Sequence, residues 1–245
     1  MSVKSWNESL PRYLDHTVLR PEATKADVLR LCAEAREQGF VVIFVPPCYV
    51  DEAVAAVAGT DVQVGIPIGF PLGGHSTHAK VTEAMEAVAH GARVLDMVIN
   101  ISRLKSGDYD VVRNDMAAVV QATPGVNHKV ILETCLLTRE EKITACRLAV
   151  EAGMDYVKTS TGFNQAGATV EDVRLMKEAV AGRAKVKASG GIRDWKTTRE
   201  LLEAGADRIG TSASLKILSE WRAALVAMRG TAIRVKALLV PVDLV

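Results

Sequence analysis

The stretch Asp155-Tyr-Val-Lys158-Thr-Ser-Thr-Gly162 places a lysine at the end of a short β-type run and follows it directly with hydroxyl residues and a glycine. Lysine is seldom buried without a partner or a task. At the carboxyl end of a strand, beside a glycine loop, its amine could attack a carbonyl group. It could equally extend its ammonium group to solvent. This stretch alone does not distinguish the two interpretations. A second stretch, Lys185-Val-Lys187-Ala-Ser-Gly-Gly-Ile-Arg193, favours the reactive amine.

The same order, a β-type run followed by an amphipathic helical segment, repeats along the whole chain. Strict alternation of this kind predicts a parallel sheet, and eight repeats predict an α/β fold in which residues 1–245 form a single-domain (β/α)8 barrel. An open, doubly wound sheet is the rival fold. It ranks lower because no G-x-G-x-x-G motif follows the first strand and no second domain is visible. The predicted strands are approximately Tyr13–Thr17, Phe40–Val45, Val62–Ile68, Arg93–Ile99, Lys129–Glu133, Tyr156–Lys158, Lys185–Ala188 and Arg208–Gly210.

Helix boundaries carry their own signals. Three threonines stand three residues before an acidic residue, which is the pattern of a capping box; they are Thr24, Thr138 and Thr169. Four glycines end helical segments just before the next strand, where a positive φ angle is useful; they are Gly39, Gly91, Gly153 and Gly205.

Composition excludes several classes of function. Thirty basic residues nearly balance 29 acidic ones, so a nucleic acid or an anionic membrane is not expected as the main partner. The four cysteines form no C-x-x-C pair, which indicates reduced thiols in a cytoplasmic protein. The N-terminal residues lack the apolar core of a signal peptide, and no apolar run approaches the length of a membrane span.

Lys158 and Lys187 end neighbouring strands of the predicted barrel, roughly 4.8 Å apart in the hydrogen-bonding direction. If both point inward, burial and like charge both lower the pKa of a lysine, and this yields the free amine that Schiff-base chemistry requires. The alternative is a pair of lysines that reach solvent. Lys185 would share the inward face but lies nearer the opposite rim, so we expect it to be structural or solvated.

Asp96 stands in the aliphatic run Val-Leu-Asp-Met-Val-Ile-Asn100, where a carboxylate is costly to bury unless it is paired. Opposite the lysines it would be stabilised and could shuttle protons. A purely structural ion pair would place the same residue in the same position. We favour the catalytic interpretation.

Glycine loops follow the last two predicted strands, at Gly190-Gly191-Ile192-Arg193 and Gly210-Thr211-Ser212. Backbone N–H groups at such loops, together with a helix N-terminus, favour a phosphate group, and this is the usual phosphate position in a (β/α)8 barrel. Thr161 and Gly162 could close the same site. Arg193 could bind the phosphate or lie on the surface beside Asp194.

Other polar residues give weaker evidence of a function. His75 and His78 have no third ligand nearby in the sequence, so a metal site is not expected. The loop at residues 69–74 is explained by turn geometry. Glu133 is as suited to supporting its neighbours by hydrogen bonds as to chemistry.

Seven motifs together resemble the deoxyribose-phosphate aldolase family, in the right order over nearly the whole chain. The resemblance implies a Schiff-base aldolase without metal or cofactor, which cleaves 2-deoxy-D-ribose 5-phosphate reversibly to D-glyceraldehyde 3-phosphate and acetaldehyde. It also implies a homodimer or larger oligomer. The motifs are Leu14-Asp-His-Thr17, Ile68-Gly-Phe-Pro-Leu-Gly73, Leu95-Asp-Met-Val-Ile-Asn100, Val130-Ile-Leu-Glu-Thr134, Val157-Lys-Thr-Ser-Thr-Gly-Phe163, Val186-Lys-Ala-Ser-Gly-Gly-Ile-Arg193 and Ile209-Gly-Thr-Ser212.

By matching positions, the resemblance makes Lys158 the Schiff-base lysine, Lys187 the residue that perturbs its pKa, and Asp96 the proton relay. Asp15 would lie near the substrate hydroxyls. Phosphate would be held by Gly190, Gly191, Gly210 and Ser212.

Two departures stand out. Phe44 and Pro46 occupy positions where the family often has Cys and Asn, and no tyrosine follows Tyr156, whereas many members end in a tyrosine-bearing tail. Two rival functions stay open. One is a phosphate-binding isomerase or lyase that uses Asp96 and Glu133 as acid and base; the other is a non-catalytic barrel that binds a sugar phosphate.

Overall fold

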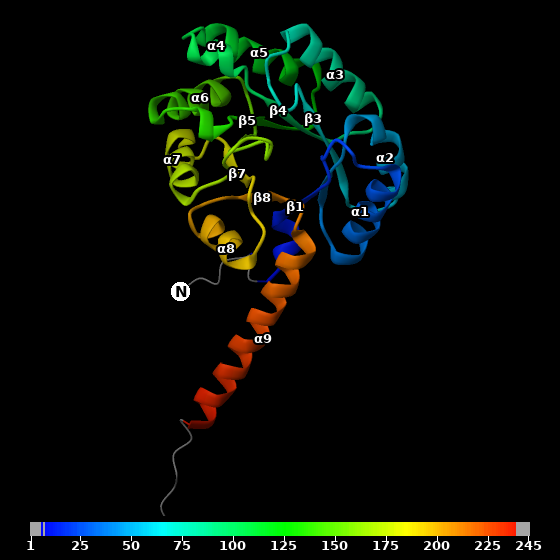
Figure 1. The fold of residues 1–245 in the computed structure, drawn as a ribbon, viewed down its shortest axis with the longest axis vertical. Helices are drawn as coiled ribbons and strands as arrows, with labels where there is room; N and C mark the ends of the chain where they lie inside the picture. Colours follow the sequence, from blue (N-terminus) through cyan, green and yellow to red (C-terminus); the bar gives the residue numbers. More distant parts are fainter. Residues whose placement is uncertain (1–5, 7, 239–245) are drawn as a thin grey trace, which may run out of the picture.

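A computed structural model describes residue 6 and residues 8–238, with side chains described as far as residue 227. Within these residues, eight parallel strands close into a barrel in sequence order, and β8 returns to pair with β1. Helices surround the barrel on the outside (Figure 1). The predicted (β/α)8 barrel is confirmed. The tyrosine-free end of the chain, residues 239–245, lies outside the described residues.

All of the predicted strands are present, with ends that differ from the predicted ones by at most two residues. The fifth is displaced as a whole, because Glu133 adopts a left-handed conformation (φ 57°, ψ 62°) that an extended strand cannot contain. The strands are β1 (Leu14–Thr17), β2 (Val42–Phe44), β3 (Gln63–Ile68), β4 (Val94–Val98), β5 (Asn127–Ile131), β6 (Tyr156–Lys158), β7 (Lys185–Ser189) and β8 (Arg208–Thr211).

The outer helices begin and end largely as their signals predict, with one exception. Thr24 and Thr138 form complete capping boxes. Thr169 accepts a hydrogen bond from the backbone of Asp172, but the carboxylate of Asp172 accepts one from Lys142 at 2.6 Å instead of completing a box. The helices are α1 (Lys25–Gln38), α2 (Val50–Val57), α3 (Thr77–Ala89), α4 (Ile101–Lys105), α5 (Tyr109–Ala122), α6 (Arg139–Glu151), α7 (Val170–Val180), α8 (Trp195–Glu203) and α9 (Ser214–Leu238).

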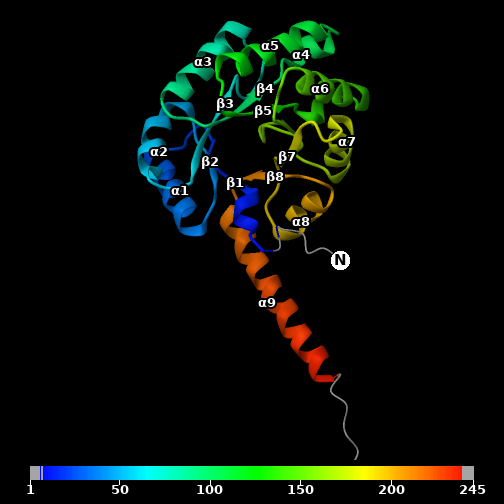
Figure 2. The same ribbon diagram turned by 180° about the vertical axis from the view of Figure 1, so that it is seen from behind.

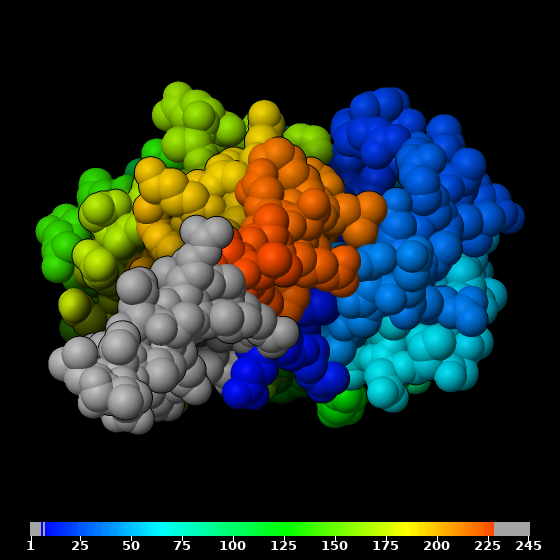
Figure 3. All heavy atoms as spheres, turned by 90° about the horizontal axis from the view of Figure 1, so that it is seen from below, coloured from blue at the N-terminus to red at the C-terminus, as the bar shows by residue number. Residues whose placement is uncertain are grey.

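Aliphatic side chains of the strands and of the inner helix faces form the core between the two layers. Figure 2 shows the same ring of helices from behind. The first half of α9 lies between α1 and α8 (Figures 1 and 3), and the rest extends away from the barrel (Figure 1). Arg222 of α9 donates a hydrogen bond to Gln38 at the end of α1. Among the described helices, none has both the length and the apolar character needed to cross a bilayer.

Candidate functional site

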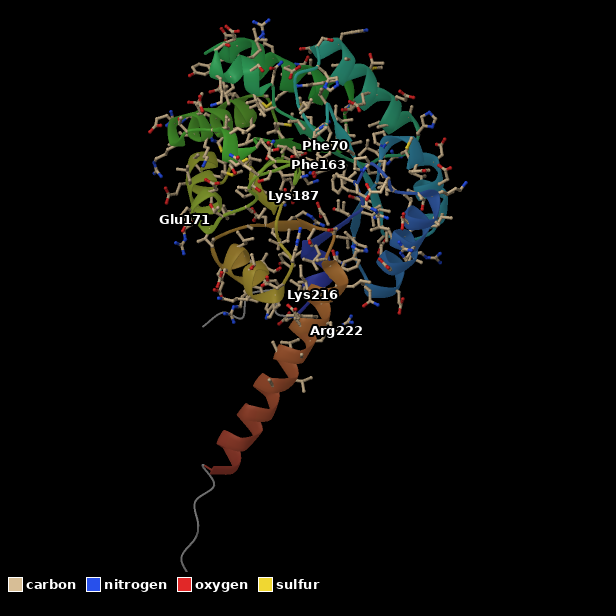
Figure 4. All side chains as sticks on the ribbon, viewed as in Figure 1. Phe70, Phe163, Glu171, Lys187, Lys216 and Arg222 are labelled. Atoms are coloured by element: carbon tan, nitrogen blue, oxygen red, sulfur yellow. The ribbon has the colours of Figure 1, made fainter. Side chains whose placement is uncertain are left out.

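Two lysines and one carboxylate meet inside the barrel. Lys158 on β6 is paired in register with Lys187 on β7, so their side chains leave the sheet side by side. Both ammonium groups donate to the same oxygen of Asp96, Oδ2, at 2.8 Å. All three side chains are buried, and Lys187 lies near the centre of the barrel (Figure 4). The structure therefore brings together the three residues that the sequence singled out for chemistry.

A second carboxylate, Asp15 of β1, extends this cluster. Its Oδ2 lies 2.6 Å from Nζ of Lys187, and its Oδ1 accepts a hydrogen bond from Nε of Arg208 at 2.5 Å. Asp15 has no exposed surface and does not line the cavity described below. The resemblance placed Asp15 beside the substrate hydroxyls, whereas its observed contacts are with the two cations.

A third lysine, Lys129 of β5, belongs to the same cluster and was missed by the sequence analysis. It is the register partner of Asp96, and its Nζ lies 3.6 Å from Asp96 Oδ1. Only 1% of its surface is exposed. Its sequence signal is a charge next to an aliphatic run, but it stands at the start of the predicted strand and not at the carboxyl end, where functional residues of a barrel are expected.

The charges of the cluster do not balance. Four cationic side chains, Lys129, Lys158, Lys187 and Arg208, surround two carboxylates, Asp15 and Asp96. An excess of positive charge in a poorly solvated interior is relieved most easily when a lysine loses its proton. The charge count alone therefore favours a neutral amine in this cluster.

The pKa directions agree with this count. Burial lowers the pKa of Lys158, and the charge of Lys187 lowers it further against the opposing effect of Asp96. Burial also lowers the pKa of Lys129 to about 8. For Asp15, the upward effect of burial is outweighed by Arg208 and the lysines, which bring the pKa to about 2. The carboxylates thus stay ionised at neutral pH, while Lys158 and Lys129 are the lysines whose pKa is lowered.

Phe44 lies against the cations from the β2 side. The centre of its ring is 3.9 Å from Nζ of Lys187 and 5.6 Å from Nζ of Lys158, distances at which an aromatic face attracts an ammonium group. A Cβ atom on Gly65 would come within 2.7 to 2.9 Å of three atoms of this ring. The absence of a side chain at Gly65 is therefore what admits Phe44, the residue that stands where the family often has cysteine.

A cavity of about 360 Å³ opens above the cluster at the carboxyl ends of the strands. Lys158 reaches it, whereas Lys187, Asp96 and Asp15 do not line it. Every other residue predicted to bind substrate is in its lining: Thr161, Gly162, Gly190, Gly191, Arg193, Gly210 and Ser212. Thr17 at the end of β1 and the three residues that follow it, 18–20, also line the cavity and were not anticipated.

The glycines of these loops occupy positions that a residue with a side chain would fit poorly. Gly190 and Gly191 have φ angles of 86° and 74°, which favour glycine. A Cβ on Gly210 would lie 2.9 Å from Cε of Lys187, so this glycine also makes room for the buried lysine. Arg193 lines the cavity with an exposed side chain, while Asp194 caps α8 by accepting from the backbone of Thr197 at 2.8 Å.

The weaker candidates are distributed elsewhere. His75 and His78 are exposed at the start of α3. Within the described part of the chain, no group of three or more His, Cys, Asp or Glu side chains is arranged to hold a metal ion. Lys185 is exposed at the opposite rim, as expected. Glu133 is fully buried and accepts hydrogen bonds from the loop that follows β6.

The chain is similar to proteins named as aldolases over most of its length. A sequence model described as DeoC/LacD family aldolase matches residues 11–220. A deoxyribose-phosphate aldolase from Thermoanaerobacter sp. (strain X514) is 52% identical over 216 residues, covering 87% of this chain and 97% of the relative. One from Brevibacillus brevis (strain 47) is 51% identical over 211 residues, covering 86% and 96%. A solved tetrameric deoxyribose phosphate aldolase from Aeropyrum pernix has a TM-score of 0.83 and 32% identity, covering 88% of this chain and 92% of that one.

Proposed function

This chain belongs to the DeoC/LacD family of aldolases, and we propose that it cleaves 2-deoxy-D-ribose 5-phosphate reversibly to D-glyceraldehyde 3-phosphate and acetaldehyde through a Schiff base on Lys158. The observation that carries the mechanism is the contact of both lysines with one oxygen of Asp96, directly beneath a cavity that only one of the two lysines reaches. Aldolases are lyases, and the family relation supports this reaction class.

The surroundings of the two lysines support Lys158 as the nucleophile. Lys187 is held by both Asp15 and Asp96, so its charge is well compensated. Lys158 has a single close carboxylate partner and opens to the cavity. An amine that is both accessible and weakly compensated is the one that can be neutral and attack a carbonyl.

The steps follow from this geometry. Neutral Lys158 attacks the aldehyde carbon C1, and loss of water gives an iminium ion. This cation accepts the electron pair of the C2–C3 bond when the C3 hydroxyl loses its proton, so that glyceraldehyde 3-phosphate leaves and an enamine remains. Protonation at C2 and hydrolysis release acetaldehyde and regenerate the amine. Asp96, in contact with both lysines, is suited to relay these protons, and Lys187 supplies the positive charge that favours neutral Lys158.

The iminium ion is itself the electron sink, so this route calls for no metal ion and no organic cofactor. We place the phosphate at the loops after β7 and β8, where Gly190, Gly191, Gly210 and Ser212 line the cavity and Arg193 adds a cation. Thr161 and Gly162 border the space between the phosphate and Lys158. Asp15 we assign to the ion cluster, where it stabilises the charge of Lys187.

We further propose that the whole chain acts as one barrel unit, that it assembles as a homodimer or larger oligomer, and that it works in the cytoplasm on free small molecules. All four cysteines are unpaired, which supports a reducing compartment. The Aeropyrum pernix structure is tetrameric, which supports assembly of copies.

The decisive experiment is reduction with borohydride in the presence of acetaldehyde, followed by peptide mass mapping. We expect a two-carbon adduct on Lys158 in the wild-type protein and none in Lys158→Met. Folded protein without an adduct would remove the Schiff-base mechanism and bring forward acid–base chemistry through Asp96 and Glu133. Binding of deoxyribose 5-phosphate without turnover would instead indicate the non-catalytic barrel.

A further inference from the structure

Glu133 is a buried carboxylate that the proposed reaction does not use. It lies just beyond β5 and has no exposed surface. Its two oxygens accept from the backbone N–H of Thr161 at 3.3 and 3.4 Å, from the hydroxyl of Thr161, and from Nδ2 of Asn164 at 3.1 Å. All of these donors belong to the loop that follows Lys158. A buried charge with several donors from one loop fixes that loop in one conformation.

The backbone at Glu133 is adapted to this contact. Its φ angle of 57° and ψ angle of 62° lie in the left-handed region, which residues other than glycine rarely adopt. Such a conformation is unfavourable for a residue with a side chain and persists only where the surroundings impose it. The conformation ends β5 two residues before Glu133, and the carboxylate of Glu133 meets the loop after the adjacent strand, β6.

The anchored loop carries an aromatic wall of the cavity. The backbone N–H of Phe163 donates to the Thr161 hydroxyl at 3.1 Å, so the contact with Glu133 extends through Thr161 to Phe163. Phe163 lines the cavity, and its ring packs edge-on against Phe70, with centroids 5.2 Å apart and planes at 89°. Figure 4 shows the two labels together near the middle of the barrel, close to Lys187.

The two rings come from loops on different sides of the barrel, and the loop of Phe163 also contacts the loop after β7, where the backbone N–H of Ala168 donates to the carbonyl of Gly190 at 3.2 Å. Phe70 follows β3, which is opposite β7 in the closed barrel, and Phe163 comes from the loop after β6. Phe163 lines the cavity together with Lys158, and Phe70 supports its ring from outside the lining. An apolar wall beside the nucleophile bounds the space for the carbon chain of the aldehyde.

We propose that Glu133 is a positioning residue: its carboxylate anchors the loop at residues 161–164 so that Phe163, packed on Phe70, closes the cavity beside Lys158 and limits the length of the aldehyde that reaches it. This inference rests on the proposed Schiff-base function. It assigns to Glu133 the supporting role that the sequence left undecided, and it makes the aromatic pair a determinant of substrate specificity.

The test compares Glu133→Gln with a matched control, Glu141→Gln, whose carboxylate caps α6 and pairs with Lys105, neither of which lines the cavity. Glutamine keeps the size of the side chain but loses the charge and one acceptor oxygen. Borohydride trapping on Lys158 is measured separately with acetaldehyde and with pentanal, together with hydrogen exchange of the peptide that spans residues 159–167.

In Glu133→Gln we expect trapping of acetaldehyde to slow about tenfold, because a loop displaced by a fraction of an ångström misplaces the reacting groups. We expect the preference for acetaldehyde over pentanal to fall, and the amides of Thr161 and Phe163 to exchange faster. Glu141→Gln should match the wild type in all three measurements. A structural role alone would lower stability without changing the preference between aldehydes.

A second variant keeps the proposal testable if Glu133→Gln does not fold. Phe163→Ala leaves the hydrogen bonds of Glu133 in place and should relax the aldehyde preference without a comparable increase in loop exchange. Wild-type aldehyde preference in Phe163→Ala, or faster loop exchange with unchanged trapping in Glu133→Gln, would overturn the proposal. Absence of trapping in the wild type would instead overturn the Schiff-base function, so the two failures are distinguishable.

Discussion

At the scale of single residues, the number and distance of the counterions distinguish side chains that look alike in the sequence. Lys187 contacts two carboxylates at 2.6 and 2.8 Å, Lys158 contacts one at 2.8 Å, and Lys129 has its nearest carboxylate oxygen at 3.6 Å. All three are buried. The attraction to a carboxylate, which offsets the cost of burying a charge, therefore differs among the three ammonium groups.

Lys129 offers a direct test of this balance. Its pKa, about 8 in the folded protein against 10.5 for a free lysine, means that the folded state binds fewer protons than the unfolded chain between these values. The contribution of Lys129 to stability therefore becomes more favourable as pH rises from 8 to about 10.5. We expect Lys129→Met to raise the free energy of unfolding at pH 7 by about 2 kcal/mol, with a smaller gain at pH 10.

The same substitution should lower activity. Without Lys129, Asp96 interacts more strongly with Lys158, whose pKa rises, so that kcat/KM at pH 7 falls by about tenfold. Denaturant unfolding and pH–rate profiles check the two effects, with the exposed Lys185→Met as the control that should change neither. If Lys129→Met is less stable than the wild type at pH 7, Asp96 requires Lys129 as a counterion.

At the scale of elements, neighbouring strands must provide room for the large groups inside the barrel. Gly65 on β3 and Phe44 on β2 are register partners, and the ring occupies the space that a side chain at position 65 would fill. Gly210 on β8 likewise leaves space for the side chain of Lys187 on β7. Packing at native density leaves few alternatives to such pairs.

Gly65→Ala should therefore displace the Phe44 ring from the ammonium of Lys187. We expect a loss of about 1 to 3 kcal/mol in the free energy of unfolding, the usual cost of overfilling a packed core. In the double variant with Phe44→Leu the smaller side chain accepts the new methyl group, so the combined loss should be less than the sum of the single losses. Denaturant unfolding of the single and double variants measures this coupling. Strictly additive losses would mean that the two positions do not compete for space.

At the scale of the whole molecule, a second buried ion pair joins the barrel to its outer helices. Nζ of Lys80 on α3 lies 2.6 Å from Asp115 on α5 and donates to the carbonyl of Val98, the last residue of β4. Thr77 also donates to Asp115, at 2.8 Å. Both charged side chains are almost wholly buried, at 0% and 2% exposure. This contact fixes α3 and α5 against the carboxyl end of β4.

Removing one partner of this pair should destabilise the protein far more than removing both. We expect Lys80→Met to cost about 3 to 5 kcal/mol, because Asp115 is left buried without a counterion, and Lys80→Met with Asp115→Leu to recover much of the loss. Urea unfolding measures both, with the exposed pair Lys105–Glu141 as control, where Lys105→Met should cost less than about 1 kcal/mol. Equal losses in the single and double variants would contradict this account.

Local sequence was sufficient to predict the architecture and much of the site. Alternating aliphatic strands and amphipathic helices imply a parallel barrel, and strands of a barrel share one carboxyl edge, so Lys158, Lys187 and the glycine loops were predictable as neighbours. Asp96 was predictable as a paired carboxylate because a lone one is too costly to bury. Two of the three threonine caps formed the predicted boxes because their bonds are local.

The tertiary structure decided what depends on contacts between distant segments. The cap at Thr169 lacks the reciprocal hydrogen bond because the carboxylate of Asp172 accepts one from Lys142, 30 residues away in the sequence. Lys129 entered the cluster through register with β4, Asp15 was bound by Arg208 from the far end of the chain, and Glu133 met the loop after β6. Periodicity tells which face of a strand points inward; the partner that a charge finds there is determined by the closure of the barrel, because only closure brings strands far apart in sequence to within the length of an ion pair.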